Sequence, residues 1–159
     1  RELYADENNQ LCQRPVKEVL RLFSETKFQA KNVDLNTAIS TPQNYLLTAT
    51  LDPDTTRPVA TINFRESADG DEAYRLTIDF NTQEISIGSK DKTYKRSCDF
   101  DPLKPLRVQL FIDGTIAECF IDDAYCFTMR IYDLTEGNLS FLSTSPELTV
   151  EKVSVKTIR

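Results

Sequence analysis

The chain has 159 residues, of which 40% are hydrophobic and 28% charged, and its formal net charge is −6. These values are typical of one globular domain with a sizeable core. The acidic balance and the dispersed Lys and Arg residues argue against a nucleic-acid partner. No apolar run approaches the ~20 residues of a membrane helix, so no membrane partner is expected either.

Several absences limit the chemistry of the chain. It contains no histidine, which removes the commonest general base and the commonest metal ligand. Its four glycines show neither a GxGxxG nor a P-loop spacing, so no phosphate-binding cofactor site is indicated. Its four cysteines form no CxxC pair, which makes a zinc site unexpected. We therefore expect no catalytic, cofactor-binding or metal-binding residues.

The first 24 residues differ in pattern from the rest. From Val16 onward, apolar residues recur at i, i+3, i+4 and i+7, which predicts an amphipathic helix over 15–23. Pro15 suits the first turn of this helix, where a missing N–H costs nothing. No other strong helical pattern follows. We expect residues 1–24 to form a linker and residues 25–159 to form the main domain.

From about residue 25 the hydrophobic period is two, which predicts β-strands. The alternating run 76–80 is separated by Asn81-Thr82 from the run 84–88, a pattern that predicts a hairpin. Near the end of the chain the apolar phase slips at Glu151-Lys152, which predicts a β-bulge or a kink there. Many short strands separated by turns indicate an all-β sandwich or barrel.

The segment 106–121 reads as a hairpin whose two-residue turn is Asp113-Gly114. In this register Leu110 faces Ala117 and Val108 faces Cys119, so that large residues oppose small ones on one side. That apolar side must be covered, which predicts a second sheet packed upon it. The same register makes Arg107 the diagonal neighbour of Glu118, a cross-strand charge pair.

A second two-residue turn at Asp122-Asp123 would add a third strand to this hairpin. It places Cys126 directly opposite Cys119 on the core-facing side, close to disulfide reach. A domain with an adequate core does not require such a bridge, and free cysteine is commonly buried. We therefore expect reduced, buried thiols at both positions.

Three groups of residues carry a resemblance to a known family: Arg1–Leu3 with Gln13–Glu18, Ile62–Phe80, and Leu110–Tyr132. The last group contains a hydrophobic-Asp-Gly-Thr-hydrophobic-x-Glu-x-Phe strand pair and a later Thr-x-Arg-Ile-Tyr. The three groups together resemble the C-terminal domain of glycoside hydrolase family 32, which includes invertases, levanases, inulinases and sucrose-6-phosphate hydrolases. The signature positions, for which we expect structural roles, are Arg14, Pro15, Asp113, Gly114, Glu118, Phe120, Thr128, Arg130, Ile131 and Tyr132.

The resemblance implies a sandwich of two antiparallel sheets of the concanavalin or lectin type, preceded by a short linker helix. Family members are similar in using a five-bladed β-propeller with two catalytic carboxylates. Those carboxylates lie upstream of Arg1, so the chain itself is expected not to be an enzyme. Glu118-Cys119 superficially resembles the Glu-Cys of the family's acid/base, but it lies within the sandwich signature. We expect the acidic residues of this chain to share no pocket.

Two functions follow from the sequence. The first is a non-catalytic module that stabilises the catalytic propeller of a fructan- or sucrose-cleaving hydrolase through the helix and one apolar sheet face, with oligomer contacts as an added role. The alternative is an autonomous, lectin-like carbohydrate-binding module. Its stacking platform would come from five tyrosines: Tyr45, Tyr74, Tyr94, Tyr125 and Tyr132. The absence of Trp and of a clear aromatic row favours the first function.

Two acidic pairs offer oxygen ligands of the kind that Ca²⁺ binds, namely Asp99 with Asp101 and Asp122 with Asp123. Both pairs lie where the pattern predicts turns. Asp is favoured in turns because its side chain accepts hydrogen bonds from the nearby backbone. We therefore interpret both pairs as turn residues and expect no metal.

Overall fold

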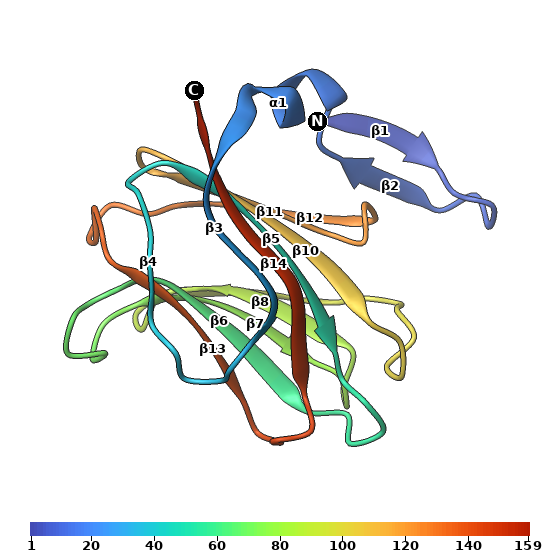
Figure 1. The fold of residues 1–159 in the computed structure, drawn as a ribbon. Coiled ribbons are helices and arrows are strands. Elements are labelled where there is room, and N and C mark those ends of the chain that lie inside the picture. The colour runs from blue at the N-terminus through green and yellow to red at the C-terminus, as the bar shows by residue number, and fades with distance from the viewer.

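The computed structural model describes all residues from Arg1 to Arg159 and is built almost entirely from strands (Figure 1). In chain order the elements are β1 (Glu2–Ala5), β2 (Leu11–Arg14), α1 (Lys17–Leu22), β3 (Phe23–Val33), β4 (Ile39–Ser40), β5 (Tyr45–Asp52), β6 (Val59–Glu66), β7 (Tyr74–Asp79), β8 (Glu84–Gly88), β9 (Thr93–Ser97), β10 (Leu106–Asp113), β11 (Ile116–Ile121), β12 (Tyr125–Arg130), β13 (Asn138–Ser143) and β14 (Thr149–Ile158).

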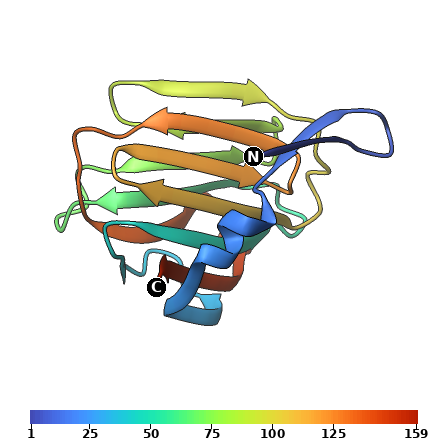
Figure 2. The same cartoon turned by 90° about the horizontal axis from the view of Figure 1, so that it is seen from above.

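The strands form two six-stranded antiparallel sheets and one separate hairpin. The sheet nearer α1, called here the helix-side sheet, has the order β12-β11-β10-β5-β14-β3. The opposite one, called the far sheet, has the order β4-β13-β6-β7-β8-β9. Strands β1 and β2 pair only with each other. Seen from above, α1 lies across the strands of the helix-side sheet, and the β1–β2 hairpin projects past them (Figure 2).

The two sheets are held together by one core of 32 buried residues. Side chains alternate between the two faces of a strand, so an apolar residue at every second position gives each sheet one apolar face. In β7, for example, Leu76 and Ile78 are fully buried, whereas Arg75 and Thr77 are half-buried on the other face. The predicted all-β sandwich of two antiparallel sheets is confirmed.

Two local predictions are also confirmed. Strands β7 and β8 form the expected hairpin, with Asp79 opposite Glu84. The phase slip near residue 151 is a bulge within β14: the pairing with β5 shifts between Glu151 and Ser154, and Lys152 has a φ of +51°. The extra residue moves the side chains that follow to the other phase, as a bulge does.

The helix is shorter than the predicted 15–23. Val16 is extended, with φ −68° and ψ 144°, and α1 ends at Leu22 because Phe23 already pairs with Ile158 in the sheet. Glu18 in the first turn and Arg21 in the last turn match the helix dipole. No helix of this chain has the length and apolar character needed to cross a membrane.

The predicted register of the β10–β11 hairpin is wrong by two positions. Asp113 pairs with Ile116, so the turn residues are Gly114 and Thr115, and Leu110 faces Cys119. Gly114 has a φ of +53°, and glycine at the first position of a two-residue loop is the preference of a type II′ turn. A shift of two keeps every side chain on its predicted face, so the core-facing set of this hairpin is still correct.

The predicted turn between β11 and β12 is wrong in a way that reverses a face. Ile121 pairs with Tyr125, which makes a three-residue loop in which Asp122 and Asp123 have φ values of +51° and +55°. Cys119 therefore faces Phe127 rather than Cys126. In consequence Phe127 and Met129 enter the core, and Cys126 packs on the outer face of the sheet.

This register predicts that no disulfide joins Cys119 and Cys126. All four cysteines of the chain are free, and burial raises the pKa of both of these thiols, which lie on opposite faces of the sheet. After mild oxidation of the folded chain, we expect non-reducing peptide mapping by mass spectrometry to find no 119–126 linkage. Oxidation after denaturation is the control, in which the two thiols are free to pair. A native 119–126 bridge would contradict the observed register.

Candidate functional site

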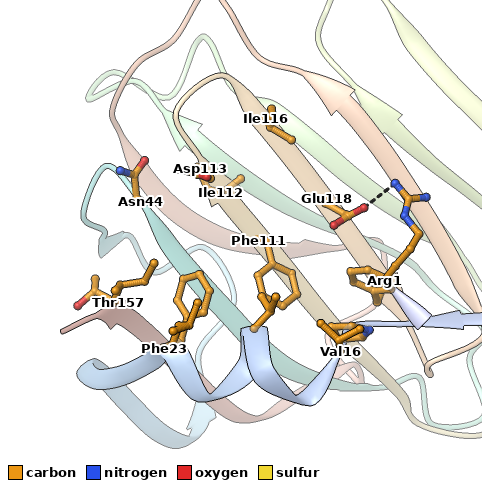
Figure 3. A pocket seen from close by; sticks show the side chains of 15 residues that line it. Arg1, Val16, Phe23, Asn44, Phe111, Ile112, Asp113, Ile116, Glu118 and Thr157 are labelled. Atoms are coloured by element: carbon orange, nitrogen blue, oxygen red, sulfur yellow. Dashed lines mark ion pairs between the residues drawn. The ribbon is translucent and has the colours of Figure 1, made fainter.

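A groove lies between α1 and the outer face of the helix-side sheet (Figure 3). Its volume is about 610 Å³, and nine of its 15 lining residues are hydrophobic. We call it the helix groove. One wall comes from Val16, Val19 and Leu22 of the helical segment, and the floor comes from the outward side chains of β10 and β11. The groove thus joins residues of the linker to the outer face of the sheet.

The floor of the helix groove is a small second core. Phe23, Leu46, Phe111 and Phe120 are buried together on the outer face of the sheet. The ring of Phe111 packs edge-to-face against those of Phe23 and Phe120, at centroid distances of 5.5 and 5.9 Å. Such edge-to-face pairs stabilise beyond the area they bury. The helix-side sheet is therefore apolar on both faces at this place.

The rim of the helix groove is apolar and uncovered. Val19, Leu22 and Ile158 are 37%, 53% and 57% exposed, respectively. Exposed apolar patches of this kind are found at protein–protein contacts and at ligand-binding grooves. Both chain termini lie on this same side of the sandwich (Figure 1).

The carboxylate of Glu118 is bound at one end of the helix groove (Figure 3). Its Oε1 atom lies 2.7 Å from a guanidinium nitrogen of Arg1, and the Thr128 hydroxyl donates to it at 3.3 Å. The prediction that Glu118 pairs with Arg107 is wrong. Glu118 lies opposite Phe111, and Arg107 of β10 instead forms an ion pair with Asp123 in the three-residue turn. Glu118 thus fixes the position of Arg1 against the sheet.

The expectation that no two acidic residues share a pocket is wrong as well. Asp113 and Glu118 both line the helix groove, because the observed register puts them diagonally across the β10–β11 hairpin. Diagonal neighbours of this kind lie ~7–8 Å apart at Cα. Glu118 is held by Arg1 and Thr128, and Asp113 is exposed next to the turn.

The signature residues lie in three parts of the structure. Arg14, Pro15, Asp113, Gly114, Glu118, Phe120 and Thr128 lie in or around the helix groove and the β1–β2 hairpin. Arg14 makes two hydrogen bonds to Glu2 across the hairpin, at 3.0 and 3.1 Å, and lies over the ring of Tyr4. Ile131 is buried in the main core, whereas Arg130 and Tyr132 are exposed at a different pocket.

In each acidic pair, one carboxylate accepts a hydrogen bond from the backbone. Asp101 accepts a hydrogen bond from the backbone N–H of Leu103 at 3.0 Å, and Asp122 accepts one from the backbone N–H of Arg107 at 2.7 Å. No group of three or more carboxylate or thiol side chains is gathered as a metal site would require. The Asp101 bond is the local one of a turn residue, whereas the Asp122 bond ties the turn to the start of β10.

The candidate sugar platform is smaller than the five predicted tyrosines. Tyr45 and Tyr74 are buried in the core, and Tyr125 is half-buried. Only Tyr94 and Tyr132 are exposed, at 46% and 66%, and both line one pocket.

Sequence reasoning missed a buried cation, Arg65, which holds three loops together. It is 2% exposed, and its guanidinium donates to the carbonyl oxygens of Leu134 at 2.7 Å, Gly114 at 2.5 Å and Gln43 at 3.4 Å. No carboxylate pairs with it, and burial lowers the pKa of its guanidinium below the ordinary value. Residue 65 has a φ of +49° at the end of β6, but the sequence alternates through it without a break, so no local signal marked this arginine as buried.

The fold and the groove define a lectin-like β-sandwich domain with an uncovered apolar groove beside its helix. A family model described as glycosyl hydrolases family 32 C terminal matches residues 16–157. The chain belongs to this C-terminal domain family and is not a catalytic domain. A comparison with curated protein sequences finds no match.

Solved structures share this fold at low sequence identity. Exo-inulinase from Aspergillus awamori is 17% identical with a TM-score of 0.77, over 99% of this chain and 34% of that one. Sucrose-6-phosphate hydrolase from Lactobacillus gasseri is 15% identical with a TM-score of 0.74, over 99% and 32%. The carbohydrate-binding module CBM66 from Bacillus subtilis is 11% identical with a TM-score of 0.62, over 83% and 94%. The chain thus spans about a third of each of the two enzymes.

The Arg65 contacts lead to a stability prediction. Arg65→Met keeps the length of the side chain but leaves the carbonyls of Gln43, Gly114 and Leu134 without their donor. Hydrogen bonds to a charged group contribute about 1.5–3 kcal/mol each, so we expect the loss of these bonds to lower the free energy of unfolding by about 3 kcal/mol or more. The matched control is Arg75→Met, a half-buried arginine on the next strand with an expected change within about 0.5 kcal/mol. Equal urea-unfolding curves for the two variants would show that Arg65 anchors nothing.

Proposed function

We propose that the chain is the non-catalytic C-terminal module of a hydrolase that cleaves β-fructosides such as fructan or sucrose. The observation that carries the proposal is the helix groove, an apolar surface at the linker side of a domain that belongs to this family. In the two enzymes named above the matching domain is only a third of the chain, so this surface has a neighbour to meet there. The module stabilises the catalytic propeller by burying the rim of the groove against it.

The β1–β2 hairpin supports the same proposal. An isolated two-stranded hairpin is marginally stable in water, and this one pairs with no other strand. Its Leu3 and Leu11 are 60% and 70% exposed. Few contacts tie it to the sandwich, among them the Tyr4 hydroxyl donating to the Asp123 carbonyl at 2.8 Å. We propose that the propeller covers these leucines, and that residues 1–24 act as the linker to the sandwich of residues 25–159.

The docking surface is tested by placing a charge on its rim. In a longer chain that carries both propeller and module, we expect Leu22→Asp to lower the thermal stability of the whole enzyme, because a carboxylate would be buried without a partner. In the isolated 159-residue chain, Leu22 is 53% exposed, so the free energy of unfolding should change by only about 0.5 kcal/mol. Leu103→Asp, at a site 48% exposed and outside the groove, is the matched control.

Three further readouts belong to this experiment. The isolated chain should unfold cooperatively, release no fructose from sucrose, inulin or levan, and self-associate through the uncovered groove in a way that Leu22→Asp reduces. Saturable release of fructose by the purified chain would refute the proposal. So would a Leu22→Asp enzyme with the thermal stability of the Leu103→Asp control.

The role of Glu118 gives a separate prediction. Because its carboxylate binds Arg1 and Thr128, we propose a structural role, and Glu118→Gln in the longer enzyme should leave turnover within a few-fold. The side chains of Arg1 and Glu118 are 41% and 27% exposed, and ion pairs so close to solvent contribute about 0–1 kcal/mol. Steady-state kinetics and urea unfolding test both expectations. A loss of about 10³ or more in turnover by a folded variant would instead make Glu118 a catalytic group.

A further inference from the structure

A second pocket opens on the side of the sandwich where the two sheets end. It has a volume of about 510 Å³, within the range usual for small-ligand sites, and we call it the tyrosine pocket. Most of its lining comes from β9 with the turn before it, from β12, and from the loop that follows β12, and Tyr74 of β7 and Ile116 of β11 complete it. Its polar and aromatic residues are Tyr74, Lys92, Tyr94, Arg130, Tyr132 and Asp133.

Exposed aromatic rings are confined to this pocket. Eight large hydrophobic side chains of the chain are well exposed, and Tyr94 and Tyr132 are the only aromatic ones among them. Most of the aliphatic ones lie instead on the β1–β2 hairpin, on α1 or at the C-terminus. The two kinds of exposed side chain therefore occupy different surfaces, and the tyrosine pocket needs an explanation of its own.

The charged side chains of the tyrosine pocket are left without ion pairs in the chain. Lys92, Arg130 and Asp133 form no salt bridge, although six such bridges occur elsewhere. The ammonium of Lys92 lies over the Tyr94 ring, 5.1 Å from its centroid, and Arg130 makes one hydrogen bond, to the Thr115 hydroxyl at 3.3 Å. Donors and one carboxylate acceptor thus surround two exposed rings.

The loop that presents Tyr132 is held on both sides. The backbone N–H of Ile131 donates to the Thr115 carbonyl at 2.9 Å, and that of Asp133 donates to the buried Tyr74 hydroxyl at 2.9 Å. One residue further, the Leu134 carbonyl accepts from Arg65. An exposed ring on a fixed backbone loses little entropy when a ligand packs on it, which is the property of a preorganised site.

These groups fit one class of ligand. A sugar ring has a C–H face that packs on an aromatic ring, and hydroxyls that both donate to a carboxylate and accept from Arg and Lys. A phosphate would be repelled by Asp133, and an apolar ligand would leave the three charges without partners. We propose that the tyrosine pocket binds a sugar residue of a carbohydrate chain, stacked on Tyr94 or Tyr132 and hydrogen-bonded by Arg130 and Asp133. That this sugar is a β-fructoside rests on the proposed function.

The test is a titration of the 159-residue chain with a panel of ligands, in which binding is measured by isothermal titration calorimetry and by NMR chemical-shift changes. The panel contains inulin- and levan-type fructo-oligosaccharides, malto- and cello-oligosaccharides, and inorganic phosphate. We expect saturable binding of an oligosaccharide and a loss of affinity of about tenfold or more in Tyr132→Ala and in Tyr94→Ala. Lys95→Ala is the control, because Lys95 is the next residue on β9 and pairs with Glu84 away from the pocket.

Urea unfolding confirms that each variant is folded, so each binding result either supports or overturns the proposal. Binding of a malto- or cello-oligosaccharide that the two tyrosine variants weaken supports the pocket and contradicts the fructoside assignment. Absence of binding to every oligosaccharide, or binding that both tyrosine variants leave unchanged, overturns the pocket. Preferential binding of phosphate overturns it too. None of these results bears on docking of the helix groove, which the Leu22→Asp comparison tests independently.

Discussion

The structure depends on the burial of two apolar sheet faces against each other. Neither sheet is stable alone, because each has one face of large aliphatic and aromatic side chains, and the 32-residue core removes both from water together. The helix α1 and the β1–β2 hairpin lie outside this sandwich. The helix-side sheet is special because the rings of Phe111 and Phe120 give its outer face an apolar patch of its own. Leu20 of α1 packs against that patch, which forms the floor of the helix groove.

The faces of the strands were easier to predict than their pairing, for a physical reason. Alternation is a local property, so the core residues of β10 and β11 follow from the sequence whatever the turn, and an error of two positions moved none of them. An error of one residue in the length of a loop, by contrast, moves every side chain of the next strand to the opposite face. The left-handed backbone of both Asp122 and Asp123 lengthens the next turn to three residues, and this moved the side chains of β12 to the opposite face.

The parts that could not be predicted are those made by residues distant in sequence. Arg65 looks like an ordinary polar position in an alternating strand, yet it bonds to carbonyls 22, 49 and 69 residues away. The pairing of β1 with β2 and the Arg1–Glu118 contact are likewise long-range or weakly patterned. Among the five tyrosines, only the fold decides which are core and which are exposed. The family signature was readable because it combines local turns with a hairpin.

The two candidate surfaces differ in the physics that they use. The helix groove presents aliphatic side chains, which lose little besides hydration when a complementary protein surface covers them, and this suits a permanent contact. The tyrosine pocket presents rings on an anchored loop together with unpaired charges, which would be costly to bury against an apolar surface. Arg65 and Glu118 connect these surfaces to the core, since one fixes the loop of Tyr132 and the other fixes Arg1 at the groove. A single sandwich can therefore hold one surface for a fixed neighbour and another for a soluble ligand without conflict between them.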